Sequence, residues 1–111
     1  METAQVNKKA DELTILVADD EGDIRDGAER ILKRIGFRVL KAARGDEAQK
    51  MAEAMRPDMV LLDLKMPGQD GLEVLKFIRQ MDPRILVIII TGYATVEAAI
   101  EAMKRGAYDF I

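Results

Sequence analysis

The sequence LTILVADDEGD (residues 13–23) joins a continuous apolar run to four carboxylates within five positions. Short apolar runs that are rich in Val, Ile and Leu are typical of strands buried in a sheet. The run therefore predicts a strand over residues 13–18. Asp19, Asp20 and Glu21 would follow directly at the carboxyl end of that strand, where a buried sheet meets solvent.

Four further apolar runs alternate with helical patterns along the chain. They predict strands over residues 37–42, 58–63, 85–90 and 107–111. Between the strands, apolar residues recur at the spacing of one helix face, which predicts four helices. The residues with this spacing are Ile24, Ala28, Ile31, Leu32 and Ile35, then Ala48, Met51, Ala52 and Met55, then Leu72, Leu75 and Ile78, and finally Val96, Ala99, Ile100 and Met103. Alternating strands and helices indicate a doubly wound α/β fold with a five-stranded parallel sheet.

Glycine and proline residues support the predicted boundaries. Gly36 and Gly106 stand where helix C-caps are expected, and Pro57 and Pro83 follow predicted helix ends. The three most apolar strands lack the alternation of a half-exposed strand, which indicates a sheet that is covered on both faces.

The composition limits the chemistry that is available. The 111 residues are 49% apolar, which is enough for the core of one domain. The formal charge is -3 and the basic residues are scattered in short pairs, which argues against a nucleic-acid-binding surface. Because Cys and His are both absent, disulfides, thiolate or imidazole metal sites and nucleophiles of these types are excluded. Any chemistry depends on carboxylates, hydroxyls and cations.

The start of the chain and its longest aliphatic run indicate where the protein acts. Residues 1–12 lack the apolar run of a signal peptide, and the run over residues 85–90 is too short to span a bilayer. We therefore expect a cytoplasmic protein without a membrane partner. We also expect a frayed segment over residues 1–12 and one domain over residues 13–111.

Acidic and hydroxyl side chains follow three of the predicted strands. Asp19 and Asp20 end the first strand, Asp63 the third and Thr91 the fourth. In parallel α/β sheets such strand ends meet at one edge, and ligands bind near the point where the strand order reverses. Carboxylates crowded there repel each other, and a hard divalent cation such as Mg²⁺ would relieve that repulsion. A solvated loop with a helix cap is the alternative for Asp19, Asp20 and Glu21.

Other acidic or phosphate-binding motifs do not fit. An EF-hand loop that begins at Asp19 would need Gly and Glu where Ile24 and Arg30 stand. Neither a GxGxxG nor a Walker GxxxxGK motif occurs. A carboxylate beside a hard cation suits phosphoryl transfer to aspartate, with Asp63 as the nucleophile. Thr91 could donate its hydroxyl to a phosphoryl oxygen, or simply stand in a turn.

These residues resemble a known family. The pair Asp19-Asp20, DLKMPGQDG over residues 63–71, TGYAT over residues 91–95 and GAYDFI over residues 106–111 are similar to receiver domains of bacterial two-component response regulators. The segment GYATVEAAIEAMKRGAYDFI is most similar to receivers of enhancer-binding transcription activators of the nitrogen-regulatory type. The resemblance implies a flavodoxin-like sheet with the strand order 2-1-3-4-5.

The resemblance also implies a phosphorylation site. A sensor histidine kinase would donate a phosphoryl group to Asp63. Asp19, Asp20 and Asp63 would hold Mg²⁺, and the main-chain carbonyl of Lys65 would complete the protein ligands.

A route for the signal is implied as well. Thr91 would move toward the phosphoryl group, and Phe110 would fill the space that Thr91 leaves, although a plain core role is the alternative for Phe110. Lys65 and Tyr93 would tune the lifetime of the phosphoryl group. The helix over residues 94–105 and the strand after it would form the face that is read by a second subunit or by a downstream output domain, which would be an ATPase and DNA-binding module.

The sequence departs from the family pattern at its end. The family carries a lysine shortly after the last strand and then a final helix, and both positions fall beyond Ile111. We therefore interpret the chain as truncated within or just after the fifth strand. Without the lysine we expect phosphorylation of this chain to be slow or undetectable, even if Mg²⁺ binds. An uncovered apolar face would favour a homodimer or a domain-swapped oligomer.

Three functions compete on the basis of the sequence. The leading hypothesis is a phosphoacceptor signalling domain that is regulatory and not a turnover enzyme. A Mg²⁺-dependent phosphohydrolase of the haloacid-dehalogenase type would need an acid two residues after Asp63, where Lys65 stands. The third function is a receiver-like module that binds a partner without phosphorylation. The missing lysine favours it for this chain, whereas the complete set of Asp19, Asp20, Asp63 and Thr91 disfavours it for the parent protein.

Overall fold

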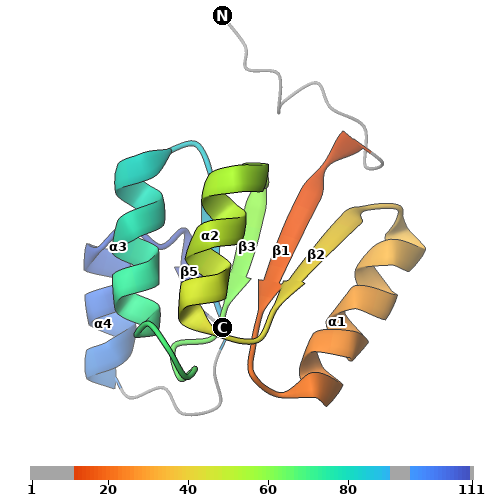
Figure 1. Cartoon of the computed structure of the whole chain (residues 1–111). Helices are drawn as coiled ribbons and strands as arrows, with labels where there is room; N and C mark the ends of the chain where they lie inside the picture. Colours follow the sequence, from red (N-terminus) through yellow and green to blue (C-terminus); the bar gives the residue numbers. More distant parts are fainter. Residues whose placement is uncertain (1–11, 91–95, 111) are drawn as a thin grey trace, which may run out of the picture.

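The computed structural model describes residues 12–90 and 96–110. Every predicted strand and helix is present, in the predicted order along the chain (Figure 1). The elements are β1 Thr14–Ala18, α1 Gly22–Ile35, β2 Arg38–Ala42, α2 Gly45–Met55, β3 Met59–Leu62, α3 Gly71–Met81, β4 Leu86–Ile89, α4 Val96–Lys104 and β5 Asp109–Phe110.

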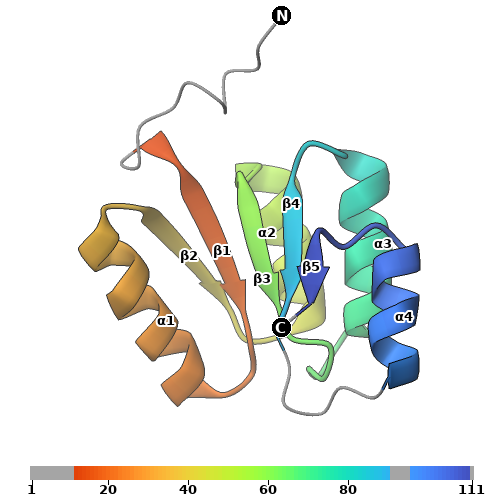
Figure 2. The same cartoon turned by 180° about the vertical axis from the view of Figure 1, so that it is seen from behind.

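The five strands form one parallel sheet in the order β2-β1-β3-β4-β5, which confirms the predicted fold class. Leu16 of β1 pairs with Val60 of β3, and Val60 pairs with Val87 of β4. Figures 1 and 2 show α2, α3 and α4 on one face of the sheet and α1 on the other. Because the strand order reverses between β1 and β3, the carboxyl ends of these two strands form the edge where a ligand is expected.

The hydrophobic core lies between the sheet and the helices α2, α3 and α4. The central strands place alternate side chains on this face, and helix side chains cover them completely. The fully buried residues include Leu16 and Ala18 of β1, Val60 and Leu62 of β3, Val87 and Ile89 of β4, and Val74, Leu75 and Ile78 of α3. Burial of each large side chain contributes about 1.5–3 kcal/mol. The core therefore fixes the positions of the strand ends.

The opposite face of the sheet is covered unevenly. All residues of α1 are described and none of them is buried, although the helix has a strong apolar stripe. Ile24, Ile31 and Ile35 of this stripe are 45%, 60% and 59% exposed. The expectation that both faces are covered holds for β1 but not for β4, where Leu86 is 37% exposed. The reason is that α1 packs on β1 and β2, and no other helix in the described ranges lies on this face.

Two glycines confirm the predicted ends of α1 and α4. Gly36 and Gly106 have φ angles of 118° and 99°, in the left-handed region that glycine reaches without strain. The Gly36 N–H donates to the carbonyls of Leu32 and Lys33 and so satisfies the last turn of α1.

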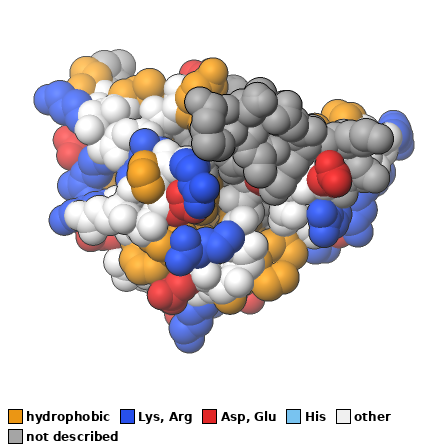
Figure 3. Space-filling model, turned by 90° about the horizontal axis from the view of Figure 1, so that it is seen from above, with side chains coloured by type: hydrophobic (Ala, Val, Ile, Leu, Met, Phe, Trp, Pro, Cys, Tyr) orange, Lys and Arg blue, Asp and Glu red, His pale blue; other side chains and the backbone are white. Residues whose placement is uncertain are grey.

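The end of the molecule at the amino-terminal edge of the sheet carries basic and acidic side chains side by side (Figure 3). Arg84 and Arg56 lie 3.1 and 3.7 Å from the buried carboxylate of Asp82. The hydrogen bond from Arg84 lowers the pKa of the Asp82 carboxyl. Charges at this end therefore pair with each other.

Among the helices of the described ranges, none combines the length and the hydropathy that a membrane span requires.

The loop between β3 and α3 packs tightly on the start of α2. The Gly45 N–H donates to the Pro67 carbonyl at 3.0 Å. A Cβ atom at Gly45 would lie 1.9 Å from the carbonyl oxygen of Gln69. This close approach of two backbones requires glycine at position 45 and fixes the loop that follows β3.

Two glycine substitutions are expected to change stability in opposite directions. Gly45→Ala should lower the free energy of unfolding by about 1–3 kcal/mol, because the Gln69 backbone must move. Gly27→Ala should raise it by about 0.5–1 kcal/mol, because Gly27 lies inside α1 and a Cβ there has no neighbour within 4 Å. Urea denaturation measures both changes. Equal effects of the two substitutions would contradict the packing described for the loop.

Candidate functional site

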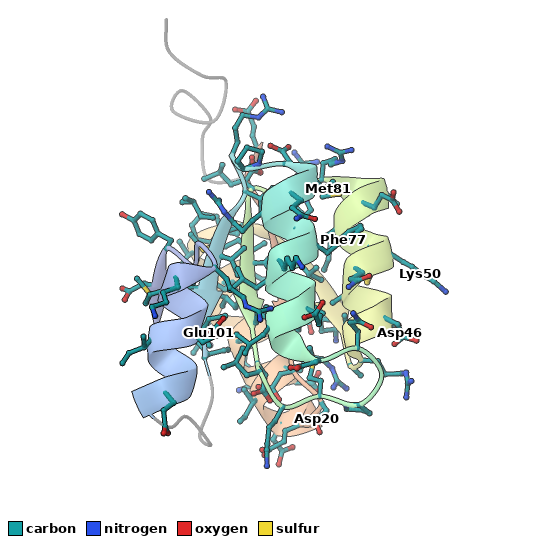
Figure 4. All side chains as sticks on the ribbon, turned by 90° about the vertical axis from the view of Figure 1, so that its left-hand side faces the viewer. Asp20, Asp46, Lys50, Phe77, Met81 and Glu101 are labelled. Atoms are coloured by element: carbon teal, nitrogen blue, oxygen red, sulfur yellow. The ribbon has the colours of Figure 1, made fainter. Side chains whose placement is uncertain are left out.

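Three carboxylates meet at the carboxyl edge of the sheet, between β1 and β3. Asp19 follows β1 and Asp63 follows β3; they are 3% and 6% exposed, whereas Asp20 is exposed. One carboxylate oxygen from each residue lies within 4.8 Å of the other two. Figure 4 shows Asp20 at this end of the molecule, beside the loop that leads into α3. Residues that are distant in the sequence are therefore brought together at the point where the strand order reverses.

Main-chain groups orient the two buried carboxylates. Oδ1 of Asp19 accepts a hydrogen bond from the Glu21 N–H at 2.9 Å, and Oδ1 of Asp63 accepts one from the Lys65 N–H at 3.1 Å. The N–H groups of Asp19 and Asp63 donate to the carbonyls of Ala42 and Ala18, which extend the sheet ladder by one residue. Each acid is thus held by the sheet and by the turn that follows it.

The cluster is electrostatically unfavourable when all of its carboxylates are charged. Burial raises the pKa of the Asp19 carboxyl, and the charges of Asp63 and Asp20 raise it further, while the hydrogen bond from Glu21 opposes them. A cation among the three acids would favour their charged forms.

The donor set fits a hard divalent cation. Carboxylate oxygen is the ligand type that Mg²⁺ and Ca²⁺ prefer. Mg²⁺ lies about 2.1 Å from its ligands, so two ligands on opposite sides of one ion are about 4.2 Å apart. The oxygens within 4.8 Å are close to this span, and the exposed Asp20 can move to reach it. Bound there, the ion would neutralise charge on the carboxylates and on an incoming anion.

The structure describes the other predicted site residues to different extents. Thr91 and Tyr93 lie outside the described residues. Phe110 belongs to β5, but its side chain is outside what the structure describes. Lys65 is exposed and its main chain contacts Asp63, while the role of its carbonyl as a ligand stays a prediction.

Sequence reasoning missed two residues that support the site. Arg25 of α1 is half-buried and donates from Nη1 to the main-chain carbonyl of Asp19 at 2.8 Å. Gly71, at the start of α3, admits no Cβ because that atom would lie 2.5 Å from Cα of Leu64. In the sequence, Arg25 looks like any charged helix residue, and Gly71 like a turn residue.

The parallel sheet in this order, with an acidic edge at its switch point, defines a receiver-type α/β domain. Residues 15–111 match the family described as response regulator receiver domain, and the chain belongs to that family. This confirms the family that the sequence motifs resemble.

Similar proteins include the nitrogen assimilation regulatory protein NtrX of Azorhizobium caulinodans, which is 40% identical over 87% of this chain and 22% of its own length. The chain thus spans about a fifth of the length of NtrX and of the similar regulators AtoC of Escherichia coli and NtrC of Salmonella typhimurium. A CheY-like receiver domain protein from Methanospirillum hungatei has a TM-score of 0.87 and 31% identity, over 89% of this chain and 79% of that one. A response regulator from Burkholderia pseudomallei, with a phosphorylated aspartic acid, a calcium ion and citrate, has a TM-score of 0.84 and 30% identity. The match covers 89% of this chain and 58% of that one.

Asp19→Asn is expected to raise the free energy of unfolding by about 1 kcal/mol when divalent cations are removed by EDTA. Because burial raises the pKa of Asp19 in the folded state, its charged form costs stability above that pKa. This cost disappears as the pH falls through the folded-state pKa. The gain should therefore be present at neutral pH and shrink in acid, as measured by urea denaturation over a pH series.

Asp23→Asn provides a matched control in the exposed first turn of α1. It removes an equal charge without relieving burial, so it should give no gain in stability. An Asp19→Asn variant that is less stable than the unsubstituted chain in EDTA would show that the cluster is not under this repulsion.

Proposed function

We propose that Asp63 accepts a phosphoryl group from the phosphohistidine of a sensor histidine kinase. Mg²⁺ would be held by Asp19, Asp20, Asp63 and the main-chain carbonyl of Lys65. The observation that carries this proposal is the approach of three carboxylate oxygens to within 4.8 Å of one another at the switch point of the sheet. The phosphorylated aspartic acid of the similar Burkholderia protein supports it.

The residues present account for the steps of this reaction. An oxygen of Asp63 would attack phosphorus, the bond between phosphorus and the kinase imidazole would break, and the released imidazole nitrogen would take up a proton from solvent. The Lys65 N–H holds Oδ1 of Asp63 and so fixes the direction of its other oxygen. Because Asp63 is almost fully buried, few water molecules reach it from the side of the core.

The phosphorylated site would act on the rest of the domain and on an output domain. Thr91 would contact the phosphoryl group and Phe110 would follow its movement, while Lys65 and Tyr93 would set how long the phosphoryl group lasts. The readout would be an ATPase and DNA-binding module, in line with the transcriptional regulators among the similar proteins. The domain would act in the cytoplasm as a regulator and not as a turnover enzyme.

Phosphorylation is tested with acetyl phosphate and Mg²⁺, followed by intact-mass measurement, on a chain extended at its carboxyl end to include the lysine that the family pattern places after the fifth strand. The unsubstituted chain should gain the mass of one phosphoryl group, and Asp63→Ala should gain none because the nucleophile is gone. Asp23→Asn, an exposed acid outside the cluster, should behave like the unsubstituted chain. An adduct that persists in Asp63→Ala would refute Asp63 as the acceptor. Steady phosphate release would favour a hydrolase, and neither adduct nor release would favour a module that works without phosphorylation.

We also propose that two copies of this chain associate through the open face, which we define as Ile24, Ile31 and Ile35 of α1 with Leu86 of β4. These four side chains are all at least one-third exposed. Figure 2 shows α1 on the side of the sheet opposite the core helices, and Leu86 lines a pocket with Ile15 and Phe37, outside the core. Exposed apolar surface of this kind favours association, either as a dimer or by exchange of an element between copies.

Sedimentation velocity tests the association. The unsubstituted chain should form dimers or larger species as its concentration rises. Ile31→Glu should weaken this association by about tenfold, because it places a charge in the apolar contact. Met55→Glu, a matched change at an exposed residue of α2, should have little effect. A chain that stays monomeric at high concentration would rule out the open face as a contact between copies.

A further inference from the structure

Arg25 connects α1 to the acidic cluster. It lies in the first turns of α1, and its own N–H donates to the Glu21 carbonyl at 3.0 Å, as expected in a helix. Its half-buried side chain turns back toward the end of β1, where Nη1 donates to the main-chain carbonyl of Asp19 at 2.8 Å. A charged donor on one element thus binds the backbone of a residue in the candidate cation site.

The carbonyl that Arg25 binds belongs to the peptide unit between Asp19 and Asp20. Asp19 has other restraints, since its N–H bonds to Ala42 and its carboxylate accepts from the Glu21 N–H. Asp20 is exposed and lies two residues beyond the end of β1, so the sheet does not orient it directly. Because a peptide unit is planar, holding its carbonyl also sets the direction in which the chain enters Asp20.

We propose that Arg25 is a positioning residue for divalent-cation binding. By fixing the peptide unit between Asp19 and Asp20, it aims the exposed Asp20 carboxylate toward Asp63. This inference rests on the proposed function, because it gives Arg25 a part in the cation site. It adds a determinant of cation affinity that is not itself a ligand.

The two effects of Arg25 on cation binding have opposite signs. Its positive charge near three carboxylates competes with a bound cation and would weaken binding. Its hydrogen bond orders the site in advance and would strengthen binding. Because Arg25 is only half-buried, solvent weakens the effect of its charge through a high effective dielectric constant. The hydrogen bond is a direct contact at 2.8 Å and is screened much less, so we expect it to dominate.

Isothermal titration calorimetry with Mg²⁺ on the whole chain separates these effects. Arg25→Met keeps the length of the apolar stem and removes both donor and charge, and it should weaken Mg²⁺ binding by about tenfold. Arg25→Lys keeps the charge and a hydrogen-bond donor of poorer geometry. Its affinity for Mg²⁺ should therefore lie between those of the unsubstituted chain and Arg25→Met. Arg30→Met, an exposed arginine on the same helix, should bind Mg²⁺ like the unsubstituted chain.

A second measurement excludes a purely structural role. Urea denaturation in EDTA gives the stability of each variant without cation, and circular dichroism confirms that each is folded during the titration. If Arg25→Met binds Mg²⁺ as tightly as the unsubstituted chain or more tightly, the proposal is overturned, whatever its stability. If the unsubstituted chain itself binds no Mg²⁺, the proposed function fails together with this inference. Loss of binding in the Arg25 variants alone, with Arg30→Met unchanged, supports the positioning role.

Discussion

The repulsion between carboxylates at the carboxyl edge of the sheet is the constraint on which the site depends. Two of the three acids are almost fully buried, and burial raises the pKa of Asp19. An acid that were free to move would turn toward water. Asp19 and Asp63 cannot do so without giving up the main-chain hydrogen bonds that hold their Oδ1 atoms. The fold therefore holds an unfavourable charge arrangement that a bound cation would relieve.

The hydrophobic core supplies the free energy that keeps this arrangement in place. Ala18 and Leu62, the last residues of β1 and β3, are fully buried and pair with each other in register. Each is followed directly by one of the buried acids. Because the strands cannot slide without moving every buried side chain to the wrong position, the separation of Asp19 and Asp63 is fixed by packing. The acids provide the carboxylate oxygens of the site, and the packing of the core fixes the positions of Asp19 and Asp63.

Much of this could be predicted from the sequence because it depends on local periodicity and on a general topological rule. The apolar runs gave the strands, glycine marked the left-handed ends at Gly36 and Gly106, and the rule for parallel sheets brought Asp63 to the end of the strand beside Asp19 and Asp20. The contact of Arg25 with the Asp19 carbonyl could not be predicted in this way.

Contacts between helices, strands and loops could not be predicted from the sequence. A charged residue on a helix is usually solvated, so nothing in the pattern distinguishes Arg25 from Arg30. The resemblance implied an uncovered apolar face, but it did not show that Ile31 belongs to that face, since an apolar stripe has the same spacing whether or not another element covers it. Gly45 reads as a turn residue, although its role is to admit the backbone of Gln69.

The way in which α4 is attached suits the movement that signalling through Thr91 would require. Helix α3 buries Val74, Leu75 and Ile78 in the core, whereas Ala102 is the buried residue among the side chains described for α4. Arg105 joins the end of α4 to Glu73 of α3 at 3.2 Å and also binds Glu101, which Figure 4 shows on the side of α4 that faces α3. Ion pairs this exposed contribute about 0–1 kcal/mol each. Such pairs add little to the attachment of α4, whereas the strands that carry the acids are fixed by the core. The proposed phosphorylation of Asp63 would therefore take place on a rigid part of the domain, while signalling through Thr91 would act on a helix whose ion pairs with α3 are exposed.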